Sequence, residues 1–358
     1  MDDLEPIITT SELAAHRDPG DAWVAIDGVV YDLGRFLAAH PGGPVIERCL
    51  GRESGALIRA SHVAELDRLL ASPAWRAKAG IRRVGRLEDA AIWRVKGRWG
   101  SRVVFPREDD DLGVELRRRV RAYLASASLP AIPRHGALLD VIIVGGLFFL
   151  TWYGGLVLGH AWIAALCGVM TALLGMKLGH AALHGGFART PWIRRLAGHA
   201  FDFAGASSIA WEIEHDDHHF NTNTTIDTDL QHWPLLRLHP AQPRRWHHRL
   251  QHLYVLPLYS LVAARWWLMS PIEGLAGRGA RRQVIPLLLR AANLALLATP
   301  CFLFPAAEAA GLLAIYFVTT SYVTSLNFAV THVNDRVEYI GEAGPTRSWT
   351  EEQIRTAS

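Results

Sequence analysis

Closely spaced histidines carry the strongest chemical signal in this sequence. His180 and His184 follow a long apolar run, and His215, His218 and His219 form a second group. Residues four apart share one face of a helix, so the first pair can reach one metal centre. In the second group the adjacent pair diverges, so the set can serve two metals. Imidazole suits iron, zinc and copper, and the ligands alone do not select the metal.

The sequence lacks the Glu of an H-E-x-x-H motif, which zinc hydrolases use. The net charge of +3 does not favour a nucleic-acid partner. Cys49, Cys167 and Cys301 are far apart and odd in number, so no disulfide framework or cysteine metal site is expected. The first residues are acidic and polar, which does not fit a signal peptide.

Residues 8–87 combine short β-type runs, turn residues and helical patterns, which predicts a small α+β domain. Within it, DAWVAIDGVVYDLGRFLAAHPGG at 21–43 resembles the cytochrome b5 family. The resemblance implies a haem b held by His40 and by His62 on an opposite helical wall. Two imidazoles saturate a haem iron, which then transfers electrons without binding oxygen. A loop histidine at 40 and a surface histidine at 62 are the alternatives.

The family usually has an aromatic residue one turn before the second haem histidine, and this sequence has Leu57 and Ile58 there. Both are apolar and could pack on the haem. The Pro-Gly-Gly turn after His40 would let the backbone approach the haem edge.

Two long apolar stretches predict an all-α membrane domain. Residues 141–176 contain no formal charge and suit two spans, broken near 159–160. A second pair is expected at 285–305 and 309–331, where Arg290 could snorkel to the interface.

Two further segments are predicted to lie at a membrane surface. The linker 88–136 contains an amphipathic helix at 111–126 with several arginines, which suits anionic headgroups. A solvated helix face is an equally weighted alternative. The apolar stretch 253–269 is interpreted as an interfacial helix, with Trp266 and Trp267 at headgroup level.

Arginine distribution predicts the orientation. The connection 180–283 contains eleven arginines, whereas the short turns 159–160 and 305–308 contain no basic residue. By the positive-inside rule the connection is cytoplasmic. Four spans then place both termini, the haem domain and both histidine groups on the cytoplasmic side of a multi-pass membrane protein.

Residues 137–358 resemble the membrane fatty acid desaturase family. The two histidine groups match the first two histidine boxes of that family, and the pattern continues after them. The further matching residues are Trp211, Asn223, Asp227, Asp229 and the stretch 247–259. A fused cytochrome b5 domain points to front-end acyl-lipid desaturases and their sphingolipid relatives.

This resemblance implies two iron ions held by His180, His184, His215, His218 and His219. His332, at the end of the last span, is equally well interpreted as a further ligand or as an ordinary helix-end histidine. A set at 247, 248 and 252 is interpreted as an interface segment and His199 as structural. Asp227 and Asp229 could orient imidazoles or cap a loop.

The activity implied is oxygen-dependent desaturation of the acyl chain of a lipid or acyl thioester that enters from the bilayer. Electrons would come through the haem from a separate NAD(P)H-dependent reductase, since the sequence shows no dinucleotide-binding fingerprint. A fatty acid or sphingolipid hydroxylase on the same scaffold and an inactive haem-bearing membrane fragment are the alternatives.

The family also requires a third histidine box of the form Q/H-x-x-H-H, which these 358 residues do not contain. The sequence is therefore interpreted as truncated at the C-terminus before that box. Five or six imidazoles would leave at least one iron under-coordinated. For this form the expectation is a bound haem and a di-iron centre that is weak or empty.

Overall fold

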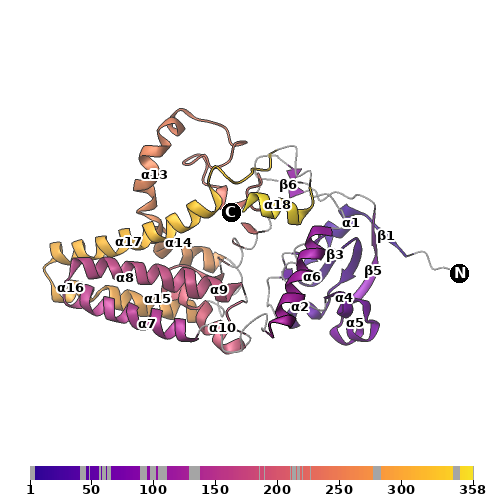
Figure 1. Cartoon of the computed structure of the whole chain (residues 1–358), viewed down its shortest axis with the longest axis horizontal. Coiled ribbons are helices and arrows are strands. Elements are labelled where there is room, and N and C mark those ends of the chain that lie inside the picture. Colours follow the sequence, from indigo (N-terminus) through magenta and orange to yellow (C-terminus); the bar gives the residue numbers. More distant parts are fainter. Residues whose placement is uncertain are drawn as a thin grey trace.

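The computed structural model shows a small sheet-containing N-terminal domain followed by a helical region (Figure 1). It describes residues 5–40, 46–47, 49–55, 58, 62, 66–88, 95–96, 102–103, 111–128, 138–184, 186–188, 190–209, 211, 215, 218–219, 221–225, 227–276, 284–341 and 347–357. The Pro-Gly-Gly turn and Leu57, on which part of the haem prediction depends, lie outside these residues.

A five-stranded sheet forms the N-terminal domain, with strand order β1-β5-β4-β3-β2. The strands are β1 (Ile7–Ile8), β2 (Arg17–Asp18), β3 (Asp21–Ile26), β4 (Val29–Asp32) and β5 (Arg82–Leu87). Asp27 and Gly28 both have positive φ, of 51° and 78°, as a tight hairpin between β3 and β4 requires. The Glu53 carboxylate accepts hydrogen bonds from both of their N–H groups and so ties the hairpin to the segment around residue 53.

Short helices pack against this sheet around its apolar core. They are α1 (Thr10–Ala15), α2 (Phe36–Ala39), α4 (Leu66–Ala71) and α5 (Pro73–Ala79). Phe36 on α2 packs against the core, and its ring meets the edges of both His40 and Trp75. His40 is therefore held at the end of a helix that the core anchors. A two-stranded sheet, β6 (Val95–Lys96) and β7 (Arg102–Val103), follows the domain.

Among the described residues, four helical segments are long and apolar enough to cross a membrane, and the predicted breaks near 159–160 and Pro305 are confirmed. They lie side by side in Figure 1, with the α16 end opposite the α9 end. Each is built from one or more elements. These are α7 (Leu138–Trp152) with η2 (Tyr153–Val157); α8 (Ala161–Leu173), η3 (Leu174–Gly179) and α9 (His180–Leu183); α15 (Val284–Leu297) with α16 (Thr299–Leu303); and α17 (Ala306–His332).

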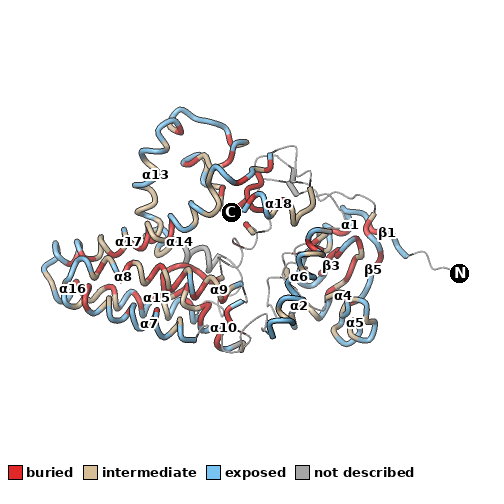
Figure 2. Tube along the Cα trace, in the orientation of Figure 1, coloured by how far each residue is buried: buried red, intermediate tan, exposed pale blue. Residues whose placement is uncertain are grey.

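The bundle buries its inner faces and exposes large apolar side chains on its outer faces, as a bilayer requires (Figure 2). Helices α8 and α17 pack closely against each other. A Cβ on Gly168 would lie 2.6 Å from the Tyr316 carbonyl oxygen. Two hydrogen bonds cross the same contact, from Thr320 Oγ1 to the Gly168 carbonyl and from the Tyr316 hydroxyl to Thr171 Oγ1. Small residues let helix backbones approach in this way.

The other α-helices of the region after residue 110 are not part of the four long apolar segments. They are α6 (Asp111–Ser126), α10 (Pro191–Gly198), α11 (Ala200–Phe203), α13 (Gln251–Tyr259), α14 (Val262–Ala276) and α18 (Trp349–Thr356). The predicted helix at 111–126 is present as α6, and it contacts α18. Its apolar residues Val114 and Tyr123 stay exposed. The single helix predicted over 253–269 is instead two helices, with the break just after Pro257.

The prediction that Arg290 snorkels to the interface is wrong, whereas the headgroup-level position expected for Trp266 and Trp267 stays a prediction. Trp267 packs against the bundle core. Its indole lies so close to Gly205 that a Cβ added to this glycine would clash with it. The centroid of the Trp266 ring lies 5.7 Å from that of Phe201. Arg290 does not snorkel but is only 4% exposed, and its guanidinium donates to the Ala206 carbonyl. Protein carbonyls left free at the end of α11 satisfy this charge better than a distant interface would.

The α8–α17 contact can be tested with two glycines in helix interiors. Gly168→Ala is expected to destabilise the bundle by roughly 1–3 kcal/mol, because the added methyl has no room. Gly311→Ala is the matched control, since nothing lies within 4 Å of its Cβ position. It should be neutral or stabilising by up to about 1 kcal/mol. Thermal unfolding in detergent, followed by tryptophan fluorescence, compares the two; equal melting temperatures would contradict the packing described.

Candidate metal centre and haem site

Four histidines converge at the end of the second apolar helix. His180 and His184 come from α9 and its C-terminal cap, and the other two come from the second histidine group. Four contacts join their Nε2 atoms: His180–His184 at 2.8 Å, His180–His215 at 2.8 Å, His184–His215 at 3.1 Å and His215–His219 at 2.8 Å. The side chains of the two sequence groups therefore share one centre.

These short contacts are not explained as hydrogen bonds. Nε2 of His215 has three ring nitrogens within 3.1 Å, yet a ring nitrogen offers a single proton or a single lone pair. One cation between the four nitrogens satisfies all of them at once. Nitrogens bound to one ion at about 2.1 Å lie roughly 3 Å apart, which matches this geometry. The donor set therefore fits a metal ion, and imidazole suits iron.

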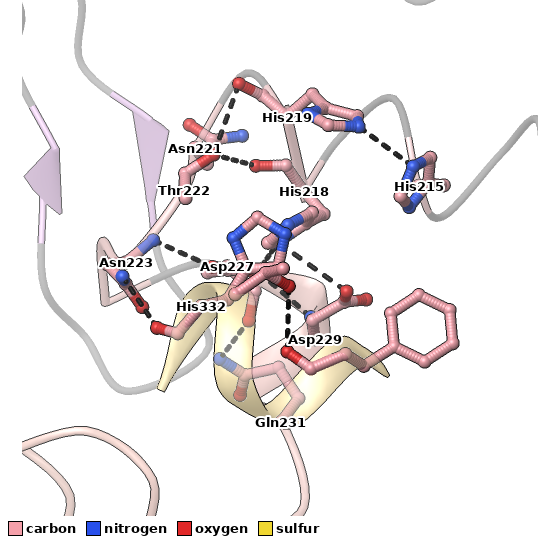
Figure 3. Close-up of polar contacts among 12 residues, drawn as sticks. His215, His218, His219, Asn221, Thr222, Asn223, Asp227, Asp229, Gln231 and His332 are labelled. Atoms are coloured by element: carbon pink, nitrogen blue, oxygen red, sulfur yellow. Dashed lines mark hydrogen bonds and ion pairs between the residues drawn. The ribbon is translucent and has the colours of Figure 1, made fainter. Parts of the chain in front are cut away.

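His218 turns away from this centre, although it is the neighbour of His219. Its Nδ1 lies 2.7 Å from Asp227 Oδ1, and both side chains are fully buried (Figure 3). A carboxylate on Nδ1 fixes the tautomer and leaves Nε2 as the atom that can bind a metal. The divergence expected for the adjacent pair is therefore present. Asp227 both orients an imidazole and caps the short helix η4 (Thr228–Leu230), where it accepts the Asp229 N–H.

His332, at the end of α17, lies beside His218. Their ring centroids are 4.4 Å apart and the rings are nearly perpendicular. Nδ1 of His332 is buried and has no hydrogen-bond partner among the described residues. The His332 ring also lies 6.4 Å from that of His219, so it is next to the four-histidine centre.

Local backbone irregularity positions the first pair. The helix changes to π-type over η3, directly before His180, and π-turns commonly accompany functional sites. A Cβ on Gly179 would lie 2.8 Å from the backbone nitrogen of Phe201, so only glycine lets α11 approach here. This contact brings α11 against the helix that carries His180. The spacing of the histidines alone gave no signal for it.

Trp211 is a site residue whose role the sequence did not reveal. Its indole stacks on the His215 ring, with centroids 4.1 Å apart, and meets the edge of His180 at 5.5 Å. The rings of Phe201 and Phe328 lie 4.6 and 5.4 Å from the indole on other sides. An aromatic wall therefore backs the four-histidine centre. The matched position before the second group was its only sequence signal.

Burial favours the neutral form of His215 and His219. Desolvation, followed by the neighbouring imidazoles, lowers the pKa of His219 to about 3 and lowers that of His215 further. Burial lowers these pKa values because it removes the water that stabilises the charged imidazolium. Neighbouring imidazoles lower them further because a second positive charge in the cluster would be repelled. Neutral imidazole is the form that binds a metal, so the protein holds these side chains in that form at neutral pH.

The N-terminal domain brings His40 and His62 together. Their ring centroids are 5.9 Å apart, and His62 donates from Nδ1 to the Ile58 carbonyl at 2.7 Å. Two imidazoles bound at about 2 Å to one iron place their centroids roughly 6 Å apart, so this pair fits a haem iron. Ile58 is buried in the same core, in line with its expected apolar role.

Four further histidines that the sequence analysis considered lie outside the four-histidine centre. His199 pairs with the buried Asp202, as expected for a structural residue. His247 and His248 both bond to the Pro234 carbonyl, and His252 is exposed on α13. None of these joins the four-histidine centre, which agrees with the interpretation of this stretch as something other than a histidine box.

Comparison with known proteins places these sites in two families. Residues 9–75 match the cytochrome b5-like haem/steroid-binding domain, and residues 156–358 match the fatty acid desaturase model, which covers more than half of the chain. The chain belongs to the fatty acid desaturase family. It combines this domain with an N-terminal cytochrome b5-like domain.

Curated relatives share modest identity with this desaturase-family chain. The acyl-lipid (8-3)-desaturase of Physcomitrium patens is 28% identical over 72% of the chain and 53% of the relative. The chloroplastic acyl-lipid (7-3)-desaturase of Chlamydomonas reinhardtii is 26% identical over 99% and 73%. The sn-1 linoleoyl-lipid 6-desaturase of Arthrospira platensis is 28% identical over 42% and 43%. The chain spans about half the length of most curated relatives it matches.

The haem site predicts a specific loss. His40→Ala or His62→Ala is expected to remove the low-spin haem absorption, because one imidazole leaves the iron unsaturated. His16→Ala is the control, since that ring stacks on Trp23 in the same domain and contacts neither histidine of the pair. Reduced-minus-oxidised absorption spectra of the full chain measure the outcome. An unchanged spectrum in either haem-pair variant would contradict the assignment.

The His218–Asp227 pair predicts an effect on metal affinity. Asp227→Asn should weaken metal binding by about 10–100-fold, because the imidazole loses the carboxylate that orients it. Asp202→Asn is the matched control, since this buried carboxylate pairs with His199, a histidine outside the four-histidine centre. Titration of the full chain with Co²⁺, followed by visible absorption, compares the variants. Equal affinities would show that Asp227 is only a loop cap.

Proposed function

We propose that the protein is an oxygen-dependent desaturase that introduces a double bond into the acyl chain of a lipid or an acyl thioester. The observation that carries this proposal is the convergence of four imidazole nitrogens at the end of a helix that is apolar enough to cross a membrane. Membership of the desaturase family and the fused cytochrome b5-like domain support it.

The chain's own residues supply two metal positions and a haem position. His180, His184, His215 and His219 would hold one iron, His218 and His332 would contribute to a second, and His40 and His62 would hold haem b. When bound, the irons supply the reduction of dioxygen and the haem supplies one-electron transfer. Burial favours the neutral form of His215 and His219, Asp227 fixes the tautomer of His218, and the Trp211 indole backs the first centre.

The overall reaction balances with four electrons. Two C–H bonds of adjacent methylenes break and a cis double bond forms, which releases two hydrogens with their electrons. Two further electrons and two protons complete the reduction of one dioxygen to two waters. A separate NAD(P)H-dependent reductase supplies these electrons through the haem domain of the chain.

The position of the site suggests how an acyl chain reaches it. The aromatic wall extends from Trp211 through Phe201 and Phe328 to Trp266, so it reaches α17 and α14. An apolar chain that enters from the bilayer can lie against these rings while water stays outside. The relatives in Physcomitrium patens and Chlamydomonas reinhardtii are named acyl-lipid desaturases, which favours a lipid-linked chain over a free acid as substrate.

The arginine asymmetry supports a cytoplasmic histidine end. The connection between the second and third spans carries the arginines, whereas the turns at the opposite end of the bundle carry none. This orientation would place the haem domain, the iron centre and both termini on one side of the membrane, where a soluble reductase can supply electrons.

Product mass tests the reaction. The full chain, expressed with a reductase in host membranes that contain deuterium-labelled acyl lipids, should remove two hydrogens from the chain. His184→Ala and His215→Ala should abolish this loss, because each removes a nitrogen from the shared centre. His247→Ala is the matched control, since its ring bonds only to the Pro234 carbonyl and to neighbouring rings.

Gain of one oxygen without loss of two hydrogens would replace the desaturase by a hydroxylase on the same scaffold. Iron analysis gives an independent readout: non-haem iron bound to wild type should fall in the two histidine variants and stay unchanged in the control. Haem without any additional iron in wild type would overturn the enzyme assignment for this chain.

A further inference from the structure

Asn223 joins four separate segments behind the second histidine group. Its side-chain Nδ2 donates to two backbone carbonyls, that of His332 at 2.9 Å and that of Thr356 at 2.7 Å. Its backbone N–H donates to Asp227 Oδ2 at 2.7 Å, and its carbonyl accepts the Ile340 N–H at 3.0 Å. The residue is fully buried. Figure 3 shows its side chain directed at the backbone of His332.

Both carbonyls bound by the amide belong to helix ends. His332 is the last residue of α17 and Thr356 is the last residue of α18. The last carbonyls of a helix have no partner within it and need one elsewhere when they are buried. A primary amide has two N–H groups and can satisfy two such carbonyls together. Asn223 thus caps both helices at once.

The backbone conformation of Asn223 explains why this residue type stands here. Its φ is +55°, in the left-handed region, which asparagine tolerates better than other side chains with a Cβ. Only asparagine combines this tolerance with two side-chain donors. The turn before it is closed by the Thr224 N–H, which donates to the Asn221 carbonyl at 2.9 Å.

The contacts of Asn223 reach both members of the second imidazole pair. Through Asp227 it braces the carboxylate that orients His218, and through its amide it holds the backbone of His332. The two rings lie 4.4 Å apart with different elements behind them. Asn223 therefore helps to fix the position of His218, on the loop, relative to His332, at the end of α17.

We propose that Asn223 is a positioning residue of the metal centre and that its amide couples the seating of α18 to the orientation of His332. Its amide binds backbone carbonyls rather than an imidazole ring. The inference rests on the proposed function only in treating His218 and His332 as ligands. The coupling itself is a property of the polypeptide.

Asn223→Gly isolates the amide, because glycine keeps the left-handed backbone without strain. Loss of two hydrogen bonds should raise amide exchange about 10–100-fold in 332–341 and in α18, with no change in α8. Carbethoxylation of the His332 ring by diethyl pyrocarbonate should rise by a similar factor. Hydrogen exchange and modification, both read by mass spectrometry on the full chain, require neither bound metal nor activity.

Gln242→Ala is the matched control. Gln242 is another buried amide of the same cap; its Nε2 donates to the Leu230 carbonyl and its Oε1 accepts two backbone N–H groups. It contacts neither His218 nor His332. Its loss should lower the melting temperature while leaving exchange in α18 and modification of His332 as in wild type.

Binding of Co²⁺ adds a spectroscopic readout. In Asn223→Gly, Co²⁺ affinity at the His218 and His332 position should fall about 10–100-fold, while the four-histidine centre keeps its affinity. Wild-type exchange and modification in this variant, or the same changes in Gln242→Ala, would overturn the proposal. Should Asn223→Gly fail to fold, Asn223→Asp replaces both donors with acceptors at equal size and is expected to release α18 in the same way.

Discussion

The mutual approach of four uncharged imidazole nitrogens is the constraint on which the rest of the structure depends. Lone pairs about 3 Å apart repel, and protons cannot bridge them all, so the arrangement holds only if the surrounding protein imposes it or a cation occupies its centre. The protein imposes it from two sides. The π-turn and Gly179 set the first pair, and the Trp211 indole stacks on His215.

The apolar bundle gives this cluster its foundation. Gly168 lets α8 approach α17 closely, so the helix that ends at His180 and the helix that ends at His332 share one contact. Inside the bundle, Arg290 binds the turn after α11 and keeps that connector next to the helix carrying His180. Polar groups inside the bundle thus help to position the histidine-bearing segments at its end.

A second, buried polar layer extends the site beyond the imidazoles. Asp227 joins His218 to the turn at Asn223, and Asn223 joins that turn to the ends of α17 and α18. Each of these groups would be costly to bury alone, and the hydrogen bonds between them offset part of that cost. These hydrogen bonds connect the loop that carries His218 with the ends of α17 and α18, which are far apart in sequence.

The sequence by itself determined the α+β domain, the four apolar helices with their breaks and the histidine groups, because periodicity, charge and motif spacing are local properties. It could not determine the burial of Arg290 or the inward packing of Trp267, since both depend on which distant carbonyl or glycine lies nearby. Nor could it choose between the two interpretations of His332. Only the tertiary structure placed that ring against His218, because helix α17 must first pack on α8 before its end can reach the cap.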